Sequence, residues 1–153
     1  MMAPGRPMEV LIEDRQKRYR IDRQEIRKKA RLILGALGCP EGELSVLIVD
    51  DNDIAKLNKQ YLGRSQPTNV IAFPMQEGRF KEIHPSLLGD VVISIDTAAR
   101  EASNAGISLL SRFDQLLIHG ILHLFGYDHE RTSEAAPAMK LKERQLLRLL
   151  YPD

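Results

Sequence analysis

The sequence predicts an α/β fold of the layered α+β type, in which a mixed sheet of about four strands is flanked by helices. Strand and helix patterns alternate in the first part of the chain, and two strand patterns then follow one another. Helical patterns fill the C-terminal part. Elements in this order build layers of helices on a sheet, because each element has an apolar face to bury. The patterns leave the order of the strands open.

Size and composition agree with a single domain spanning residues 8–151. The chain has 153 residues, of which 43% are apolar and 28% charged, an ordinary balance for a globular protein. Residues 1–7 carry two prolines and a glycine, and we expect a disordered lead-in there. One cysteine fits a reducing compartment, and the sequence has no apolar run of transmembrane length. Residues 1–16 lack the apolar stretch of a signal peptide, so we expect none. We therefore expect a cytoplasmic protein that has no membrane partner.

The first half of the chain carries four segments with a strand or helix pattern. Short apolar runs between turn residues predict strands, and apolar residues spaced three or four apart predict helices. Asp22 and Glu25 form a capping-box pattern, and Gly38 and Pro40 close the helix that follows. The predicted elements are a strand at 8–12, a helix at 23–37, a strand at 45–49 and a short helix after the polar residues 50–53.

The second half adds two strands and three helices by the same patterns. Polar residues before each helical pattern supply caps, and Pro74 stops the strand before it. The predicted elements are a strand at 70–73, a loop or hairpin-like excursion at 75–87, a strand at 88–95, a helix capped by Asp96 and Thr97, a long helix from Ser108, and a final helix capped by Thr132 or Ser133.

Three of the four histidines lie on the long helix and just after it. His119 and His123 are four residues apart, so a helix presents both imidazoles on one face, as two ligands of one metal ion. His129 joins them only if the chain reverses at Gly126, since glycine adopts the left-handed conformation that ends a helix. Three neutral imidazoles with an open fourth position describe a catalytic zinc site. We expect one Zn²⁺, with Ni²⁺ or another divalent ion as the alternative, because imidazole also suits those metals.

Two carboxylates are candidates for supporting the histidine ligands. Asp128 precedes the third histidine, where it either orients an imidazole or serves as an ordinary turn aspartate. Glu143 falls on the apolar stripe of the final helix between Met139 and Leu147, and a carboxylate there needs a partner. Glu143 therefore either supports a metal ligand through a hydrogen bond or lies at the solvated edge of the helix.

The residue after the first histidine indicates which chemistry the motif favours. The spacing of the three histidines and Gly126 matches the metzincin zinc proteases, but Gly120 stands at the position of their catalytic glutamate. A peptidase needs that base, whereas phosphodiester cleavage needs positive charge at the phosphate and a positioned nucleophile. Arg64 could add such charge, because a guanidinium pairs with phosphate in a bidentate way. A metalloprotease is therefore the less favoured alternative.

Basic residues are concentrated in one stretch, although the net charge is only +1. Nine Lys or Arg residues lie within residues 15–31, which form either a phosphate track or a solvated helix face. Residues 140–148 carry a weaker second patch of four basic residues. Aromatic residues make up 5% of the chain and tryptophan is absent, so we expect any nucleic acid to be bound through its backbone rather than by base stacking. Candidate contacts with such a backbone are Arg18, Arg20, Arg23, Arg27, Lys28, Thr68 and Asn69.

The histidine motif and three further blocks resemble the YbeY family, which are bacterial metal-dependent endoribonucleases of ribosomal RNA maturation. The run HGILHLFGYDH at 119–129 closely resembles the family motif H-G-x-L-H-L-x-G-Y-D-H. Further blocks similar to those of the family occur in the same order: LNKQY at 57–61 with PTNVIAFP at 67–74, LGDVVIS at 88–94, and Met139 with Glu143.

The resemblance implies a zinc-like ion bound by His119, His123 and His129, and cleavage of single-stranded RNA. It also implies a role in maturing the 3′ end of small-subunit ribosomal RNA and in ribosome quality control, with the small subunit and its assembly factors as partners. Leu62 stands where the family has an arginine thought to act in catalysis. Arg64, two residues further on, either takes over that role or is a surface arginine.

The leading interpretation is a metal-dependent endoribonuclease with His119 and Arg64 at its reacting centre. The alternative from another class is a zinc-stabilised factor that binds the ribosome or RNA with weak or no hydrolysis. The missing arginine after Tyr61 keeps that alternative open.

Overall fold

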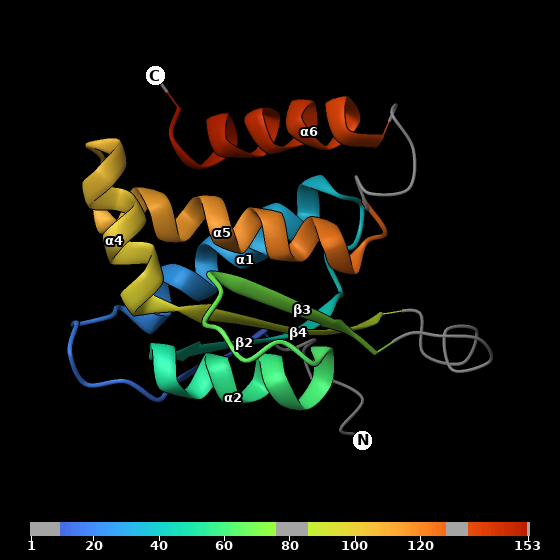
Figure 1. Cartoon of the computed structure of the whole chain (residues 1–153). Helices are drawn as coiled ribbons and strands as arrows, with labels where there is room; N and C mark the ends of the chain where they lie inside the picture. Colours follow the sequence, from blue (N-terminus) through green and yellow to red (C-terminus); the bar gives the residue numbers. More distant parts are fainter. Residues whose placement is uncertain (1–9, 76–85, 128–134, 153) are drawn as a thin grey trace.

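A computed structural model shows a four-stranded sheet that lies between layers of helices (Figure 1). It describes residues 10–75, 86–127 and 135–152. The lead-in at 1–7, residues 76–85 of the predicted excursion and the cap at Thr132 or Ser133 lie outside the described residues. The elements are β1 (Val10–Asp14), α1 (Arg23–Ala36), β2 (Glu43–Val49), α2 (Asp51–Leu62), β3 (Val70–Pro74), β4 (Leu87–Ser94), α4 (Ile95–Ala105), α5 (Leu109–Leu124) and α6 (Ala135–Leu150).

The sheet is mixed, as the sequence predicts. β1, β2 and β4 run parallel, β3 pairs antiparallel with β4, and the spatial order is β1-β2-β4-β3. Pro74 is the last residue of β3, opposite Gly89, rather than a stop placed after the strand. The proline is tolerated there because β3 is an edge strand.

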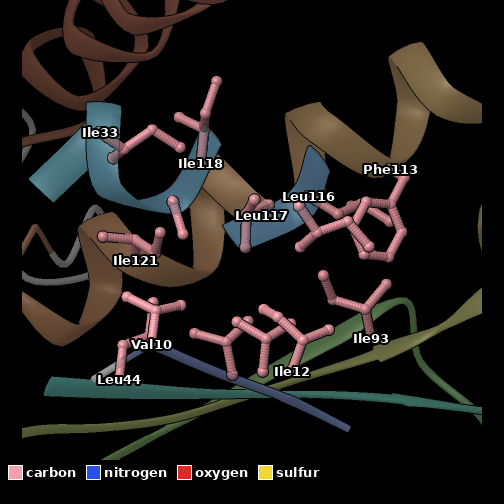
Figure 2. Packing of buried hydrophobic residues seen from close by; sticks show 14 of the residues in the cluster. Val10, Ile12, Ile33, Leu44, Ile93, Phe113, Leu116, Leu117, Ile118 and Ile121 are labelled. Carbon is pink, nitrogen blue, oxygen red and sulfur yellow. The ribbon is translucent and has the colours of Figure 1, made fainter. Parts of the chain in front are cut away.

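Helices cover the two faces of the sheet unequally (Figure 1). α1 and α5 lie on one face, α6 packs on the outer side of these two helices, and α2 lies on the other face. The main core fills the space between α5 and the strands, and Figure 2 shows several of its members: Val10, Leu44, Ile93, Leu117 and Ile121. Within the described residues, none of the helices combines the length and apolarity that a bilayer crossing requires.

Side-chain caps define where the helices start. Asp22 and Ser108 cap α1 and α5 as predicted. The cap of α4 is Ser94 and not the predicted pair Asp96 and Thr97, because Ser94 Oγ accepts a hydrogen bond from the Thr97 amide at 3.3 Å. β4 therefore passes directly into α4, and the carboxylate of Asp96 is left for contacts with other elements.

Candidate metal centre

The C-terminal half of α5 brings His119 and His123 together. Leu117, Ile118 and Ile121 are buried in the core, which leaves the two histidines half-buried on the flank of the helix. Their Nε2 atoms are 3.1 Å apart. The rings meet edge to face, with centroids 4.6 Å apart. The two imidazoles thus share one helix face, as their spacing predicts.

α5 ends in the turn that the glycine predicts. Gly126 has φ 89°, and its N–H donates to the carbonyl oxygen of His123 at 3.0 Å. The N–H of Tyr127 donates to the carbonyl oxygen of Leu122 at 3.0 Å. This pair of bonds is a Schellman motif, which ends a helix and turns the chain away from its axis. His129 and Asp128, which follow the turn, lie outside the described residues.

Glu143 of α6 reaches the first histidine from behind. Its Oε2 atom lies 2.6 Å from Nδ1 of His119, and both side chains are about one-third exposed. A carboxylate accepts the hydrogen bond, so Nδ1 carries the hydrogen and Nε2 is the ring nitrogen available to a metal ion. Nε2 is the atom that faces His123. The contact therefore orients His119 toward a position that the two histidines share.

The two imidazoles fit a divalent ion of the zinc type. Zn–N bonds are about 2.0–2.1 Å long, so two Nε2 atoms 3.1 Å apart can both reach one ion. Within the described ranges, no three His, Cys, Asp or Glu side chains gather around one cation position. The third ligand that the sequence predicts is His129, which is outside those ranges.

Gly120 has a packing role that the sequence pattern did not indicate. A Cβ atom on this residue would lie 2.6 Å from Cγ1 of Val91 and 3.2 Å from Cγ2 of Val70. Residue 120 therefore faces β3 and β4, and the two valine side chains leave no space for a Cβ atom. A longer side chain, such as the glutamate of a metzincin, has no room there.

A cavity of about 390 Å³ lies between α5 and α6 beside the first histidine. Its volume is in the range of pockets that hold small molecules, about 300–1,000 Å³. Along α5 it extends from Arg112 to His119, and along α6 from Leu147 to Lys140. We call it the α5–α6 groove; its lining residues are Asn69, Arg112, Gln115, Leu116, Ile118, His119, Lys140, Glu143, Arg144 and Leu147.

Glu101 of α4 accepts hydrogen bonds from two residues that line the α5–α6 groove. Arg112 Nε donates to Glu101 Oε1 at 2.9 Å, and the Asn69 amide donates to Glu101 Oε2 at 3.2 Å. Arg112 also donates to Gln115 Oε1 at 2.7 Å. These contacts fix the positions of one cation and two amides in the groove.

Comparison with known proteins assigns the chain to a family. A protein-family model described as Endoribonuclease YbeY matches residues 11–151. The chain belongs to the YbeY family of endoribonucleases. This membership confirms the predicted family and makes the protein an enzyme that cleaves phosphodiester bonds within RNA.

Relatives and a solved structure agree with this membership. Endoribonuclease YbeY of Geobacter sulfurreducens is 55% identical over 94% of this chain and 96% of its own length. The YbeY of Syntrophus aciditrophicus is 43% identical over 94% and 91%, and that of Aquifex aeolicus 44% over 86% and 85%. The solution structure of TM1509 from Thermotoga maritima matches with a TM-score of 0.64 and 22% identity, over 92% of this chain and 87% of that chain. That likeness supports the predicted α/β fold.

Arg64, the candidate to replace the family arginine that is absent at Leu62, does not line the α5–α6 groove. α2 ends at Leu62, on the face of the sheet opposite α5 (Figure 1). Arg64 is exposed in the turn that follows, and neither it nor the half-buried Thr68 lines the groove. Asn69 is the predicted RNA contact that does line it. A catalytic role for Arg64 stays a prediction.

The basic residues that precede Lys29 lie toward the end of α5 that is far from the histidines. Lys29 Nζ donates to Asp114 Oδ2 at 2.9 Å, and Ile33 lies near Ile118 in the core (Figure 2). α1 and α5 thus run in the same direction, and residues before Lys29 lie level with the start of α5 rather than with His119. These residues are the predicted RNA contacts Arg18, Arg20, Arg23, Arg27 and Lys28, and their contact with RNA stays a prediction.

Sequence reasoning about this YbeY chain missed Arg112 and Gln115 of the groove, whereas Lys140 and Arg144 belong to the predicted second basic patch. Arg112, Gln115 and His119 recur at steps of three and four residues along α5, and Lys140 and Arg144 are four residues apart on α6. Both spacings place side chains on one helix face. A polar stripe at this period on an otherwise apolar helix was the feature that could have indicated the groove.

Proposed function

We propose that this protein is a metal-dependent endoribonuclease that cleaves single-stranded RNA at a centre formed by His119, His123 and His129. The observation that carries the proposal is the convergence of two Nε2 atoms 3.1 Å apart. Membership of the YbeY family supports RNA as the substrate. We infer that the RNA is the 3′ end of small-subunit ribosomal RNA, and that the small subunit and its assembly factors are the partners. Such an enzyme of ribosome maturation and quality control works in the cytoplasm.

The side chains of the centre have distinct roles in this proposal. His119 and His123 would hold the ion through Nε2, and His129 would complete the set of three. Glu143 accepts the Nδ1 hydrogen of His119, which holds the ring in the required tautomer and makes it a stronger ligand. Asp128 is assigned the same orienting role for its neighbour His129. Bound Zn²⁺, or Ni²⁺ in its place, supplies Lewis acidity for the hydrolysis of a phosphodiester.

Gly120 disfavours a peptidase on structural grounds. The peptidase of this motif carries a glutamate directly after the first histidine. Residue 120 faces Val70 and Val91 of the sheet, so a carboxylate there would enter the core instead of the centre. Phosphodiester cleavage needs no base at this position, but it does need cations that neutralise phosphate charge. Arg64 remains our candidate for one bidentate phosphate contact.

A cleavage assay with matched substitutions tests the proposal. Metal-loaded protein is incubated with a single-stranded RNA and with a duplex of the same sequence, beside His123→Ala and His84→Ala variants. We expect the wild type to cleave the single strand and not the duplex. This cleavage should be lost when a chelator is added and in the His123→Ala variant. The His84→Ala variant should still cleave, because His84 lies outside the motif. An Arg64→Ala variant with unchanged turnover would remove Arg64 from the site.

The outcomes separate the alternatives. Cleavage that survives both chelation and His123→Ala would overturn the metal centre. Binding of RNA without turnover by the wild type would favour the zinc-stabilised binding factor. Hydrolysis of casein without hydrolysis of RNA would favour the protease.

A further inference from the structure

The α5–α6 groove carries an excess of positive charge next to the histidine pair. Three of its lining side chains are cationic, namely Arg112, Lys140 and Arg144, and one, Glu143, is anionic. Glu143 is engaged with His119, and Arg112 is matched by Glu101 at 2.9 Å. Lys140 and Arg144 are exposed and form no ion pair within the described residues. The unmatched charge of the groove therefore lies on these two residues of α6.

The spacing of these two cations is unfavourable for the helix itself. Lys140 and Arg144 are four residues apart, so their charges lie on one face of α6, about 6 Å apart along its axis. Like charges at this spacing destabilise a helix. An anion bound between them would relieve that repulsion. A nucleic-acid phosphate, which prefers charge-assisted contacts from Lys and Arg, has the required charge.

The rest of the groove suits an unpaired nucleotide. The half-buried Leu147 supplies an apolar surface for a ribose or the face of a base, and the buried Leu116 and Ile118 also line the groove. The orientations of two amides in the groove follow from their hydrogen bonds. The Asn69 NH₂ group donates to the Glu101 carboxylate, and Gln115 Oε1 accepts from Arg112. Asn69 Oδ1 and Gln115 Nε2 pair with no described residue, so one acceptor and one donor remain for a base edge. Only an unpaired base presents that edge, since in a duplex it is occupied by the partner base.

The predicted RNA contacts on and before α1 are separated from the histidines along the helix axes. Lys29 is level with Asp114, so Arg23 lies about 9 Å before that level along α1 and His119 about 7.5 Å beyond it along α5. The α5–α6 groove, in contrast, includes His119 itself.

We propose that the α5–α6 groove binds the RNA nucleotide adjacent to the scissile bond, with its phosphates on Lys140 and Arg144 and its base between Asn69 and Gln115. This inference rests on the proposed function and adds to it the path of the strand. It also assigns single-strand preference to the amide pair of the groove rather than to the basic residues of α1.

The salt dependence of cleavage tests this path on the metal-loaded enzyme. The groove variant is Lys140→Gln/Arg144→Gln, and the matched control is Arg23→Gln/Lys28→Gln, which removes two exposed charges from α1. With a labelled single-stranded RNA oligonucleotide below its KM, log(kcat/KM) falls linearly with log[salt]. Each lost phosphate contact lowers that slope by about 0.7 for a single strand, so we expect the groove variant to lower it by about 1.4. We expect kcat/KM to fall on the order of tenfold through KM, with kcat nearly unchanged, because the contacts bind the strand and not the reacting atoms.

A charge-preserving variant and the control decide the interpretation. Lys140→Arg/Arg144→Lys should keep the wild-type slope, which distinguishes lost charge from a disturbed α6. A groove variant with wild-type slope and KM, in an enzyme that cleaves RNA, would overturn this inference and leave the proposed function intact. A lowered slope in the control alone would place the strand on α1 and equally overturn it. A wild type that does not cleave RNA would overturn both.

Discussion

At the residue scale, Gly120 shows that a missing side chain can serve packing and chemistry together. Because Gly120 has no Cβ atom, α5 can lie close to Val70 and Val91. His119 directly precedes Gly120 in the sequence. The sequence interpretation took Gly120 as the loss of a peptidase base. The structure adds a second reason, because the position points into the helix–sheet contact. The position of α5 on the sheet, and with it that of His119 and His123, therefore depends on the glycine next to His119.

Substitution of Gly120 by alanine is expected to destabilise the protein. The new Cβ would overlap Val91 Cγ1, and overpacking of a core costs about 1–3 kcal/mol, of which the better helix propensity of alanine offsets up to about 1 kcal/mol. The matched control is Gly35→Ala on α1, whose Cβ would meet nothing within 4 Å. We expect the control to be more stable than the wild type by about 0.5–1 kcal/mol. Urea unfolding measures both, and a Gly120→Ala protein as stable as the wild type would refute the close approach.

At the element scale, α6 is held against α5 at two points. Near its middle, Glu143 contacts His119. Just beyond its C-terminal end, the Tyr151 hydroxyl donates to Asp114 Oδ2, which also accepts from Lys29 Nζ at 2.9 Å. Asp114 is fully buried, and its Oδ1 has no hydrogen-bond partner among the described residues. Its hydrogen bonds from Lys29 and Tyr151 are both accepted by Oδ2. Burial opposes the charge of Lys29, but the hydrogen bond and the charge of Asp114 outweigh it and raise the pKa of Lys29 above 10.5.

Loss of the Asp114 charge is expected to loosen α1, α5 and α6 together. In Asp114→Asn the buried ammonium of Lys29 loses its counter-charge, and breaking a buried pair costs about 3–5 kcal/mol. Tyr151→Phe removes only the hydroxyl, and we expect a loss of about 1–2 kcal/mol. Urea unfolding gives the two values, and amide exchange in α6 should quicken in Asp114→Asn. A variant within about 1 kcal/mol of the wild type would show that the pair does not hold the helix.

At the scale of the whole molecule, one polar network joins segments that are distant in the sequence. Asp51, the first residue of α2, accepts hydrogen bonds from Ser94 Oγ at 2.6 Å and Thr97 Oγ1 at 2.7 Å, and pairs with Arg100 at 2.8 Å. Its backbone N–H donates to Asp96 Oδ2 at 3.0 Å, and Asp96 Oδ1 accepts from Arg18. The network lies where β2 and β4 end, and it links the segment before α1 with α2 and α4. Arg18, predicted as an RNA contact, is one of its members.

The stability that Asp51 contributes is expected to disappear in acid. Burial opposes its ionisation, but the hydrogen bonds of Ser94, Thr97 and Arg100 and the charge of Arg100 outweigh burial and hold the pKa of Asp51 below 3.8. A folded-state pKa below the unfolded value stabilises the fold above about pH 3.8, and this contribution is lost as the pH falls through the folded value. Asp51→Asn should therefore be less stable than the wild type by about 1–3 kcal/mol at pH 7, with a difference that shrinks below pH 3.8.

The control for this prediction is Asp53→Asn in the same first turn of α2. It removes a negative charge from the same helix N-terminus, while the Asp53 carboxylate makes no hydrogen bond or ion pair with a described residue. We expect little change in stability from it. A wild-type advantage over Asp51→Asn that is independent of pH, measured by urea unfolding from pH 2 to pH 7, would contradict the assigned cause.

Local patterns were enough for most of the elements and for the histidine pair. Strands, helices and the caps at Asp22 and Ser108 follow from interactions within a few residues, which a sequence shows directly. The predicted cap of α4 was wrong because Ser94, Asp96 and Thr97 lie within four residues and each suits a cap. The competition was decided by Asp51 and Arg18, which engage Asp96 from other elements.

The sequence by itself determined the fold class, the family and the two imidazoles on one helix face, because each depends on spacing along the chain. Only the tertiary structure decided the order of the strands, the contact of Glu143 with His119 across 24 residues, and the α5–α6 groove. The physical reason is the same in all three cases. Which faces of two helices or strands meet depends on how well their side chains pack against each other, and the spacing within either one does not contain that information.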